Sequence, residues 1–282
     1  MSKITAELIK ELRERTGVGM GKCKAALEES GGDLELAIEN LRKAGMASAV
    51  KKEGREANEG SIGIGESDKA FAFVEVNSET DFVSQNEKFK QFLKDVSEEA
   101  ALTQPKDLDT FLAQKCHKDE SLTIDEYRAL IIQSLGENIQ IKRIALLPKD
   151  KNFSIGIYSH MSGRIVTAVE MTGGEGNEIL ARDIAMHIAA ESPEYLRPED
   201  VPAKIKAREE DIAKSQVEGK PANIIDKIIT GKVNSYYDQV CLLRQKYVKD
   251  GSVTVEALLK REGKEADKTF EIKNFYRWQV GE

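Results

Sequence analysis

Hydrophobic positions in the first 45 residues follow the spacing of amphipathic helices. Leu8, Ile9 and Leu12 fall on one face of a first helix. Glycines then separate a second helix from a third, which Asp33 can cap and which we expect to stop at Gly45. Three short helices of this kind predict a compact bundle of the ubiquitin-associated type.

Beyond this bundle the pattern changes to short runs typical of strands. The polar, aperiodic stretch 46–59 is interpreted as a linker, helical at most at its start. Each half of the remaining chain has a pair of strand-like runs, a helical pattern and a closing strand-like run. These runs are 61–65, 71–76 and 139–147 in the first half, and 154–158, 165–169 and 269–280 in the second. The fold class is therefore α+β, with a duplicated core of two small antiparallel sheets covered by helices.

An insertion interrupts the second half of this core. Residues 203–218 are charged with a helical pattern, and Gly219-Lys220-Pro221 predict a turn. Apolar residues of the following helix have nearly the spacing of a coiled-coil seam, so we expect an antiparallel helical hairpin. It could act as a stabilising arm or as an arm that reaches a partner. The pattern divides the chain into three parts: bundle and linker at 1–55, a first core subdomain at 56–148, and a second at 149–282 with the hairpin at about 202–243.

Composition and charge exclude several classes of function. The net charge is -7, and basic residues are mixed with acidic ones, so we expect no direct contact with nucleic acid. No apolar run approaches the roughly 20 residues that span a bilayer, and the N-terminus has no apolar signal core, so we expect no membrane partner. Three well-separated cysteines, Cys23, Cys116 and Cys241, fit reduced thiols. These features predict a cytoplasmic protein.

Candidate catalytic chemistry is sparse. The glycine cluster at 17–23 fails as a phosphate loop because Cys23 replaces the required hydroxyl residue and a helix precedes it. No cysteine or histidine spacing suits a metal, and we expect neither metal nor cofactor. An enzyme of the hydrolase or transferase class would need His160 or His187 to meet Cys116 in one pocket, which we do not expect. The sequence therefore favours a non-enzyme that works by binding another protein.

The stretch 75–83 allows two interpretations. A predicted strand ends there, and polar residues start a helix that Thr80 or Asp81 can cap. In the structural interpretation Phe82 is buried in the core, and spacing alone favours this. In the functional interpretation the same residues form a binding site.

The run Val76-Asn77-Ser78-Glu79-Thr80-Asp81-Phe82-Val83 resembles the signature of the elongation factor Ts family, the guanine-nucleotide exchange factors for elongation factor Tu. Further matches follow in family order: 11–20 with 23–27, 31–33 with 37–39, 136–139, and 184–190. Together they cover nearly the whole chain.

This resemblance implies a mechanism. The chain would bind elongation factor Tu in its GDP-bound and nucleotide-free states, disturb the magnesium and phosphate site, and promote GDP release so that GTP can rebind. Asp81 and Phe82, flanked by Thr80 and Val83, would form a wedge beside the nucleotide, with Phe82 in an apolar pocket between two partner helices. The other contact positions that the resemblance implies are Arg13, Met20, Lys24, Leu135, Gly136, His160 and His187. Family complexes are one-to-one or two-to-two.

A protein-binding scaffold is the alternative outside this family. The bundle at 5–45 would then recognise other proteins. This alternative leaves the Asp81-Phe82 stretch and the duplicated core without an explanation.

Overall fold

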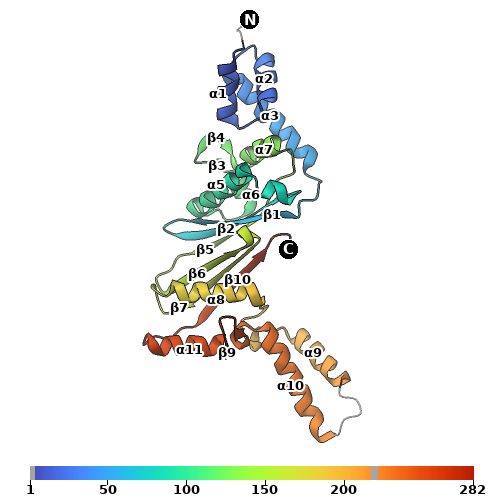
Figure 1. The fold of residues 1–282 in the computed structure, drawn as a ribbon, viewed down its shortest axis with the longest axis vertical. Helices are drawn as coiled ribbons and strands as arrows, with labels where there is room; N and C mark the ends of the chain where they lie inside the picture. The colour runs from blue at the N-terminus through green and yellow to red at the C-terminus, as the bar shows by residue number, and fades with distance from the viewer. Residues whose placement is uncertain (1–3, 217–221) are drawn as a thin grey trace. The chain divides into compact units, whose positions relative to one another are not determined.

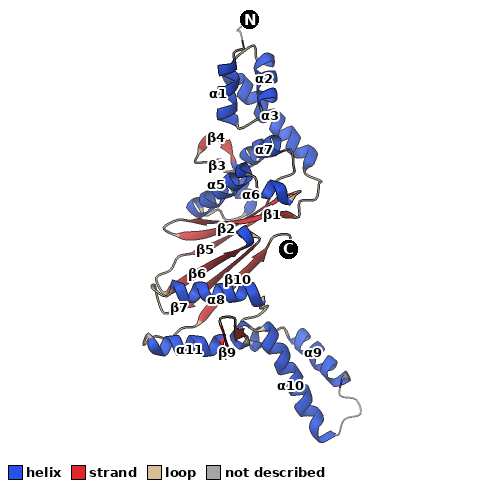
Figure 2. Ribbon diagram, in the orientation of Figure 1, coloured by secondary structure: helices blue, strands red, loops and turns tan. Residues whose placement is uncertain are grey.

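The computed structural model describes residues 4–216 and 222–282, which form two compact units. The first unit holds most residues up to Lys149, together with 162–164 and 279–282, and the second holds 150–161 and 165–278. Both units mix helices with small sheets, drawn blue and red in Figure 2. The α+β prediction is confirmed. No helix within 4–216 or 222–282 is both long and apolar enough to cross a membrane.

Three helices open the first unit, as predicted: α1 (Ala6–Thr16), α2 (Met20–Glu29) and α3 (Leu34–Lys52) (Figure 1). Leu12, Cys23 and Leu27 are fully buried at their centre. The side chain of Asp33 accepts a hydrogen bond from the backbone N–H of Leu36 at 3.0 Å, which confirms the predicted cap of α3. The likeness of this bundle to the ubiquitin-associated type stays a prediction.

The prediction that the third helix stops at Gly45 is wrong, since α3 continues to Lys52. A Cβ atom at Gly45 would lie 3.4 Å from the carbonyl oxygen of Ala129 in α7 (Ile124–Leu135). The glycine therefore serves the close crossing of two helices, and it does not end one. Beyond it, Met46 and Ala49 pack into the first core, so the first part of the expected linker is helical.

The core of the first unit is a sheet with strand order β1-β2-β5, covered by α5. Phe89, Phe92 and Val96 on α5 are fully buried in this core. The bounds are β1 (Glu59–Glu66), β2 (Ala70–Ser78), α5 (Glu87–Thr103) and β5 (Gln140–Pro148), with the short helices α4 (Asp81–Ser84) and α6 (Leu108–Ala113).

The core of the second unit repeats this arrangement with strand order β10-β7-β6 and the covering helix α8. Ile184 and Ile188 on α8 are fully buried in its core, so the predicted duplication is confirmed. The bounds are β6 (Phe153–His160), β7 (Ile165–Thr172), α8 (Glu178–Glu191) and β10 (Ile272–Gln279), with the 3-10 helices η2 (Pro198–Asp200) and η3 (Leu242–Arg244). The 3-10 helix η1 (Met161–Gly163) follows β6 along the chain, and its residues 162 and 163 belong to the first unit.

Two segments that the sequence analysis left unassigned extend this duplication. Each half has a two-stranded hairpin followed at once by a helix: β3 (Lys115–Cys116), β4 (Asp119–Thr123) and α7 in the first, and β8 (Lys246–Tyr247), β9 (Asp250–Thr254) and α11 (Val255–Glu265) in the second. Thr123 caps α7 and Thr254 caps α11. The two hairpins have the same register: Lys115 opposite Thr123 and Cys116 opposite Asp119, Lys246 opposite Thr254 and Tyr247 opposite Asp250.

Two acidic residues on α5 fasten the first hairpin. Lys118 forms an ion pair with the buried carboxylate of Asp95. One turn further along the helix, Glu99 accepts a hydrogen bond from the backbone N–H of His117 at 3.2 Å. The side-chain amide of Gln114 donates to the same carboxylate at 3.2 Å. The hairpin is thus held to α5 through charge and backbone contacts together.

The second hairpin is fastened to α8 in the same way, with a histidine in place of the glutamate. Lys249 pairs with Asp183 at 2.7 Å. One turn further along, His187 Nδ1 accepts a hydrogen bond from the backbone N–H of Val248 at 3.2 Å. Gln245 Oε1 lies 3.1 Å from His187 Nε2. His187 therefore corresponds to Glu99 of the first half.

The predicted insertion in the second half consists of two helices packed along each other, α9 (Ala203–Ser215) and α10 (Ala222–Val240) (Figure 1). Ala213 is buried on α9, and Lys232 Nζ donates to Gln216 Oε1 at 2.6 Å. The turn predicted at Gly219-Lys220-Pro221 lies outside the described residues. The coiled-coil character of the pair stays a prediction.

Candidate protein-binding site

The helical turn α4 presents an aromatic side chain to solvent directly after β2. Thr80 caps the turn, since its Oγ1 accepts a hydrogen bond from the N–H of Val83 at 3.4 Å. Phe82 is 84% exposed, and Asp81 beside it is exposed too. The interpretation that buries Phe82 in the core is therefore wrong. Exposing a phenylalanine costs roughly 1.5–3 kcal/mol relative to burying it, so the position suits an aromatic ring that a partner covers.

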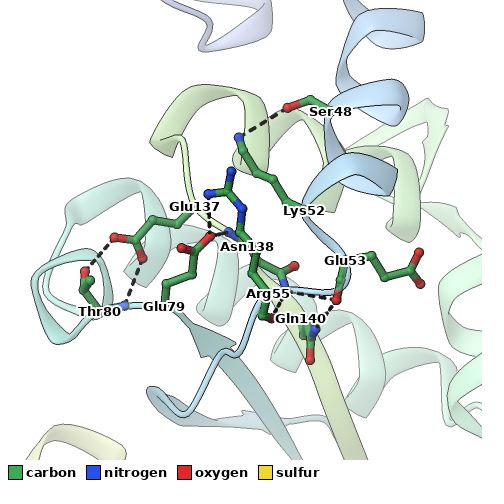
Figure 3. Close-up of polar contacts among 9 residues, drawn as sticks. All are labelled: Ser48, Lys52, Glu53, Arg55, Glu79, Thr80, Glu137, Asn138 and Gln140. Carbon is green, nitrogen blue, oxygen red and sulfur yellow. Dashed lines mark hydrogen bonds and ion pairs between the residues drawn. The ribbon is translucent and has the colours of Figure 1, made fainter.

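Glu137 holds this turn from behind. Its two carboxylate oxygens accept hydrogen bonds from the backbone N–H of Thr80 at 3.0 Å and from Thr80 Oγ1 at 2.6 Å. Both contacts appear at the left of Figure 3. Gly136, with φ at 87°, ends α7 in the left-handed conformation. Glu137 is therefore the first residue after the helix end, and its side chain bonds Thr80. The sequence analysis missed Glu137, although it lies inside the matched segment 136–139.

Glu79 and Asn138 add a second layer of support. The backbone N–H of the fully buried Asn138 donates to Glu79 Oε1 at 2.7 Å, and Arg55 pairs with the same carboxylate oxygen at 3.4 Å. The side-chain amide of Asn138 donates to the carbonyl oxygen of Arg55 at 2.8 Å. Figure 3 shows these contacts joining the chain after α3, the end of β2 and the start of β5. Hydrogen bonds to charged groups are strong, so these contacts fix the backbone that carries the exposed ring of Phe82.

Several other candidate residues gather near the C-terminal end of α7. Leu135 packs partly against the first core, and Gly136 is exposed. The loop between α1 and α2 reaches the same helix end, since Ser134 Oγ donates to the carbonyl oxygen of Gly17 at 3.1 Å. The first turn of α2 reaches it too, since Lys22 Nζ donates to the carbonyl oxygen of Gln133 at 2.9 Å. Met20, 57% exposed, begins α2 directly after this loop. Arg13 and Lys24 are exposed on α1 and α2.

The two candidate histidines differ in exposure. His160 is exposed at the end of β6, where its Nδ1 lies 3.2 Å from Tyr158 Oη. His187 is fully buried and bonded to Gln245 and Val248, so its side chain lies away from the surface of its unit. Cys116 is buried in the core of the first unit. Within residues 4–216 and 222–282, no cluster of three histidine, cysteine or acidic side chains could hold a metal ion.

The hairpin contacts predict opposite pH dependence in the two halves. The hydrogen bond to Glu99 and its negative charge raise the pKa of His117 above the usual 6.5, so its stabilisation is complete below pH 6.5 and is lost as the pH rises through the raised pKa. Burial lowers the pKa of His187 below 6.5, so its stabilisation is complete above pH 6.5 and is lost as the pH falls toward the lowered pKa.

Urea unfolding of the wild type and of the His117→Gln and His187→Gln variants between pH 5 and 8 tests this. The difference in unfolding free energy between wild type and His117→Gln should shrink with rising pH. The difference between wild type and His187→Gln should grow over the same range. If both differences in unfolding free energy changed with pH in the same direction, the opposite pKa shifts of the two histidines would be contradicted.

The geometry defines a class of protein, because an exposed aromatic ring on a turn held by hydrogen bonds is a surface for binding another macromolecule.

Comparison with known proteins identifies the family within this class. The family model "Elongation factor TS" matches residues 79–282. Elongation factor Ts of Protochlamydia amoebophila is 60% identical over 282 residues and covers all of both chains. Elongation factor Ts of Chlamydia caviae and that of Chlamydia trachomatis serovar D are 44% and 40% identical over 281 residues, again over the full length of both chains. The chain belongs to the elongation factor Ts family.

Proposed function

We propose that this chain is a guanine-nucleotide exchange factor for elongation factor Tu. It binds the GDP-bound and nucleotide-free states of that partner and promotes GDP release so that GTP can rebind. Membership of the family supports this, and the 84% exposure of Phe82 on a braced turn is the observation that carries it. Such a role in translation belongs to the cytoplasm.

The wedge consists of Thr80, Asp81, Phe82 and Val83. Phe82 enters an apolar pocket of the partner beside the nucleotide, and Asp81 disturbs the magnesium and phosphate site. Thr80 and Val83 hold the turn, since Thr80 caps it and the half-buried Val83 packs against the first core. No bond is made or broken, so the factor works without a catalytic residue.

The energetics require more than the wedge. GDP bound at nanomolar affinity is held by about 12 kcal/mol. An exchange factor weakens GDP within a ternary complex, and by linkage GDP weakens the factor to the same extent. A change in affinity of about 10⁴-fold needs roughly 5.5 kcal/mol of coupling. Burying Phe82 supplies roughly 1.5–3 kcal/mol of this, so a wider grip must supply the rest.

That wider grip uses all three parts of the chain. The bundle at 1–55, with its ubiquitin-associated-like arrangement, and the first core subdomain at 56–148 hold the nucleotide-binding domain through Arg13, Met20, Lys24, Leu135 and Gly136. The second subdomain at 149–282 binds elsewhere on the partner through His160. His187 contributes indirectly, by fixing the backbone of Val248, which is 44% exposed. Both one-to-one and two-to-two complexes are compatible with this arrangement.

Release of fluorescent GDP from purified elongation factor Tu, with and without the full chain, tests the function. The wild-type chain should accelerate release strongly at micromolar concentration. The Asp81→Ala, Phe82→Ala double variant should accelerate it far less. Equal acceleration by both proteins would keep the function and discard the wedge. Absence of acceleration by the wild type with a cognate partner would favour the protein-binding scaffold.

Replacing Glu137 by alanine should slow nucleotide release by about tenfold or more, because two hydrogen bonds from Thr80 to a charged carboxylate are lost, each worth roughly 1.5–3 kcal/mol. Amide hydrogen exchange of residues 80–84 should become faster in the same variant. Glu98→Ala is the matched control, since Glu98 is an exposed glutamate on α5 that pairs with Lys94 at 3.7 Å. Faster amide exchange with unchanged nucleotide release would show that bracing of α4 does not matter for function.

A further inference from the structure

A pocket of about 300 Å³ opens at the surface of the first unit, between the α1–α2 loop and the segment β3-β4-α7. Its apolar wall includes the buried side chains Cys116, Leu122, Leu130 and Ile131. The aromatic ring of Tyr127 completes this wall. A volume of this size, mostly apolar and lined by a few polar groups, is typical of sites for small organic molecules.

The charged groups that line the cavity are mainly cationic. Arg15, Lys88 and Lys118 contribute three positive charges, and Asp119 contributes one negative charge. This excess is notable in a chain with a net charge of -7. A cavity with positive groups above an apolar wall attracts anions and keeps their apolar part out of water.

Lys88 differs from the other two cations in its partners. Arg15 pairs with Glu35 at 2.8 Å, and Lys118 pairs with the buried Asp95. The ammonium of Lys88 instead donates to the carbonyl oxygen of Gly17 and, at 2.6 Å, to Ser134 Oγ. Among the described residues it bonds no carboxylate. Because these acceptors are neutral, they do not neutralise the positive charge of the ammonium, which can form an ion pair with an incoming anion.

We infer that this cavity binds a small organic anion with an apolar body, with Lys88 receiving the anionic group and the wall of Leu122, Leu130 and Ile131 receiving the body. The site is separate from α4 and does not depend on the proposed exchange function. Because Lys88 and Ser134 also hold the Gly17 carbonyl, the bound anion competes for the contact that joins the α1–α2 loop to the core.

Titration of the full chain with naphthalene carboxylate and with the neutral, isosteric naphthalene carboxamide tests this site. The carboxylate should bind at least about tenfold more tightly than the amide, since its hydrogen bond to the ammonium is charge-assisted on both sides. Amide-resolved NMR should place the shift changes at Gly17, at 116–122 and at 127–134. Equal affinity of the two probes would overturn recognition of the anion, and no binding of either probe would overturn the site.

Variants of Lys88 locate the anionic group. Lys88→Gln should lower the affinity for the carboxylate to that for the amide, whereas Lys88→Arg should retain most of the difference. Lys90→Gln is the matched control, because Lys90 lies on the same helix α5 and pairs with Glu87 away from the cavity lining. Circular dichroism of each variant checks that the fold is kept. Unchanged carboxylate affinity in Lys88→Gln, or an equal loss in Lys90→Gln, would overturn the proposal.

Discussion

Replacing Phe82 by alanine should slow the release of GDP from elongation factor Tu by about ten- to a hundredfold, while leaving the stability of the chain unchanged. The ring is 84% exposed in the free protein, so its removal creates no cavity there. Covering the ring in a complex would be worth roughly 1.5–3 kcal/mol, which corresponds to this range of rates. The measurement is the rate of fluorescent GDP release at fixed partner concentration, with urea unfolding of the variant alongside.

Leu102→Ala is the control for this experiment. Leu102 is another large hydrophobic residue of the first unit, 57% exposed near the end of α5, and it belongs to no proposed contact. Its variant should release GDP at the wild-type rate. Equal slowing by both variants would point to a general loss of surface hydrophobicity. A slow Phe82→Ala variant that had also lost stability would contradict the claim that the ring awaits a partner.

The regular elements of the core could be predicted because their patterns are local. Short strand-like runs rich in apolar residues placed β1, β2, β6 and β7, and helical spacing placed α5 and α8. Gly45 misled the prediction for α3 because a glycine inside a helical pattern looks like a stop. Its actual reason, the backbone of Ala129 at 3.4 Å, is distant in sequence.

The sequence predicted the helix cap of the candidate site but did not predict that Phe82 is exposed. Thr80 has the residue type and position of a helix cap, and the structure confirms it. The turn that carries the exposed Phe82 is bonded to Glu137, which lies 57 residues from Thr80 in the chain. Spacing within 75–83 contains no information about that contact.

The paired hairpins had a sequence signal that the analysis did not use. The pattern Gln-Lys-x-x-Lys-Asp-x-Ser-x-Thr occurs twice, starting at Gln114 and at Gln245. The second lysine of each copy forms the ion pair with the covering helix. The glutamine contacts the residue one turn further along that helix, Glu99 or His187. The threonine caps the helix that follows the hairpin. A search for internal repeats would have placed both hairpins and explained the burial of His187.

Adding one methyl group at Gly156 or Gly65 should destabilise the unit that contains it by about 3 kcal/mol or more. A Cβ atom at Gly156 in β6 would lie 2.1 Å from the backbone nitrogen of Arg182 in α8. A Cβ atom at Gly65 in β1 would lie 1.8 Å from the carbonyl oxygen of Ser97 in α5. Both positions meet helix backbone, which no side-chain rotation can relieve, so the helix must separate from the sheet.

Fluorescence of Trp278, the single tryptophan, reports on the second unit during urea unfolding. Gly156→Ala should lower the midpoint of that transition strongly. Gly231→Ala in the same unit is the matched control, because a Cβ atom at this exposed position of α10 would meet no atom of the described residues within 4 Å. Because alanine favours a helix interior over glycine by about 1 kcal/mol, this variant should be neutral or more stable. A small loss in Gly156→Ala, comparable to that of an ordinary surface change, would mean that α8 can move away from β6 at little cost.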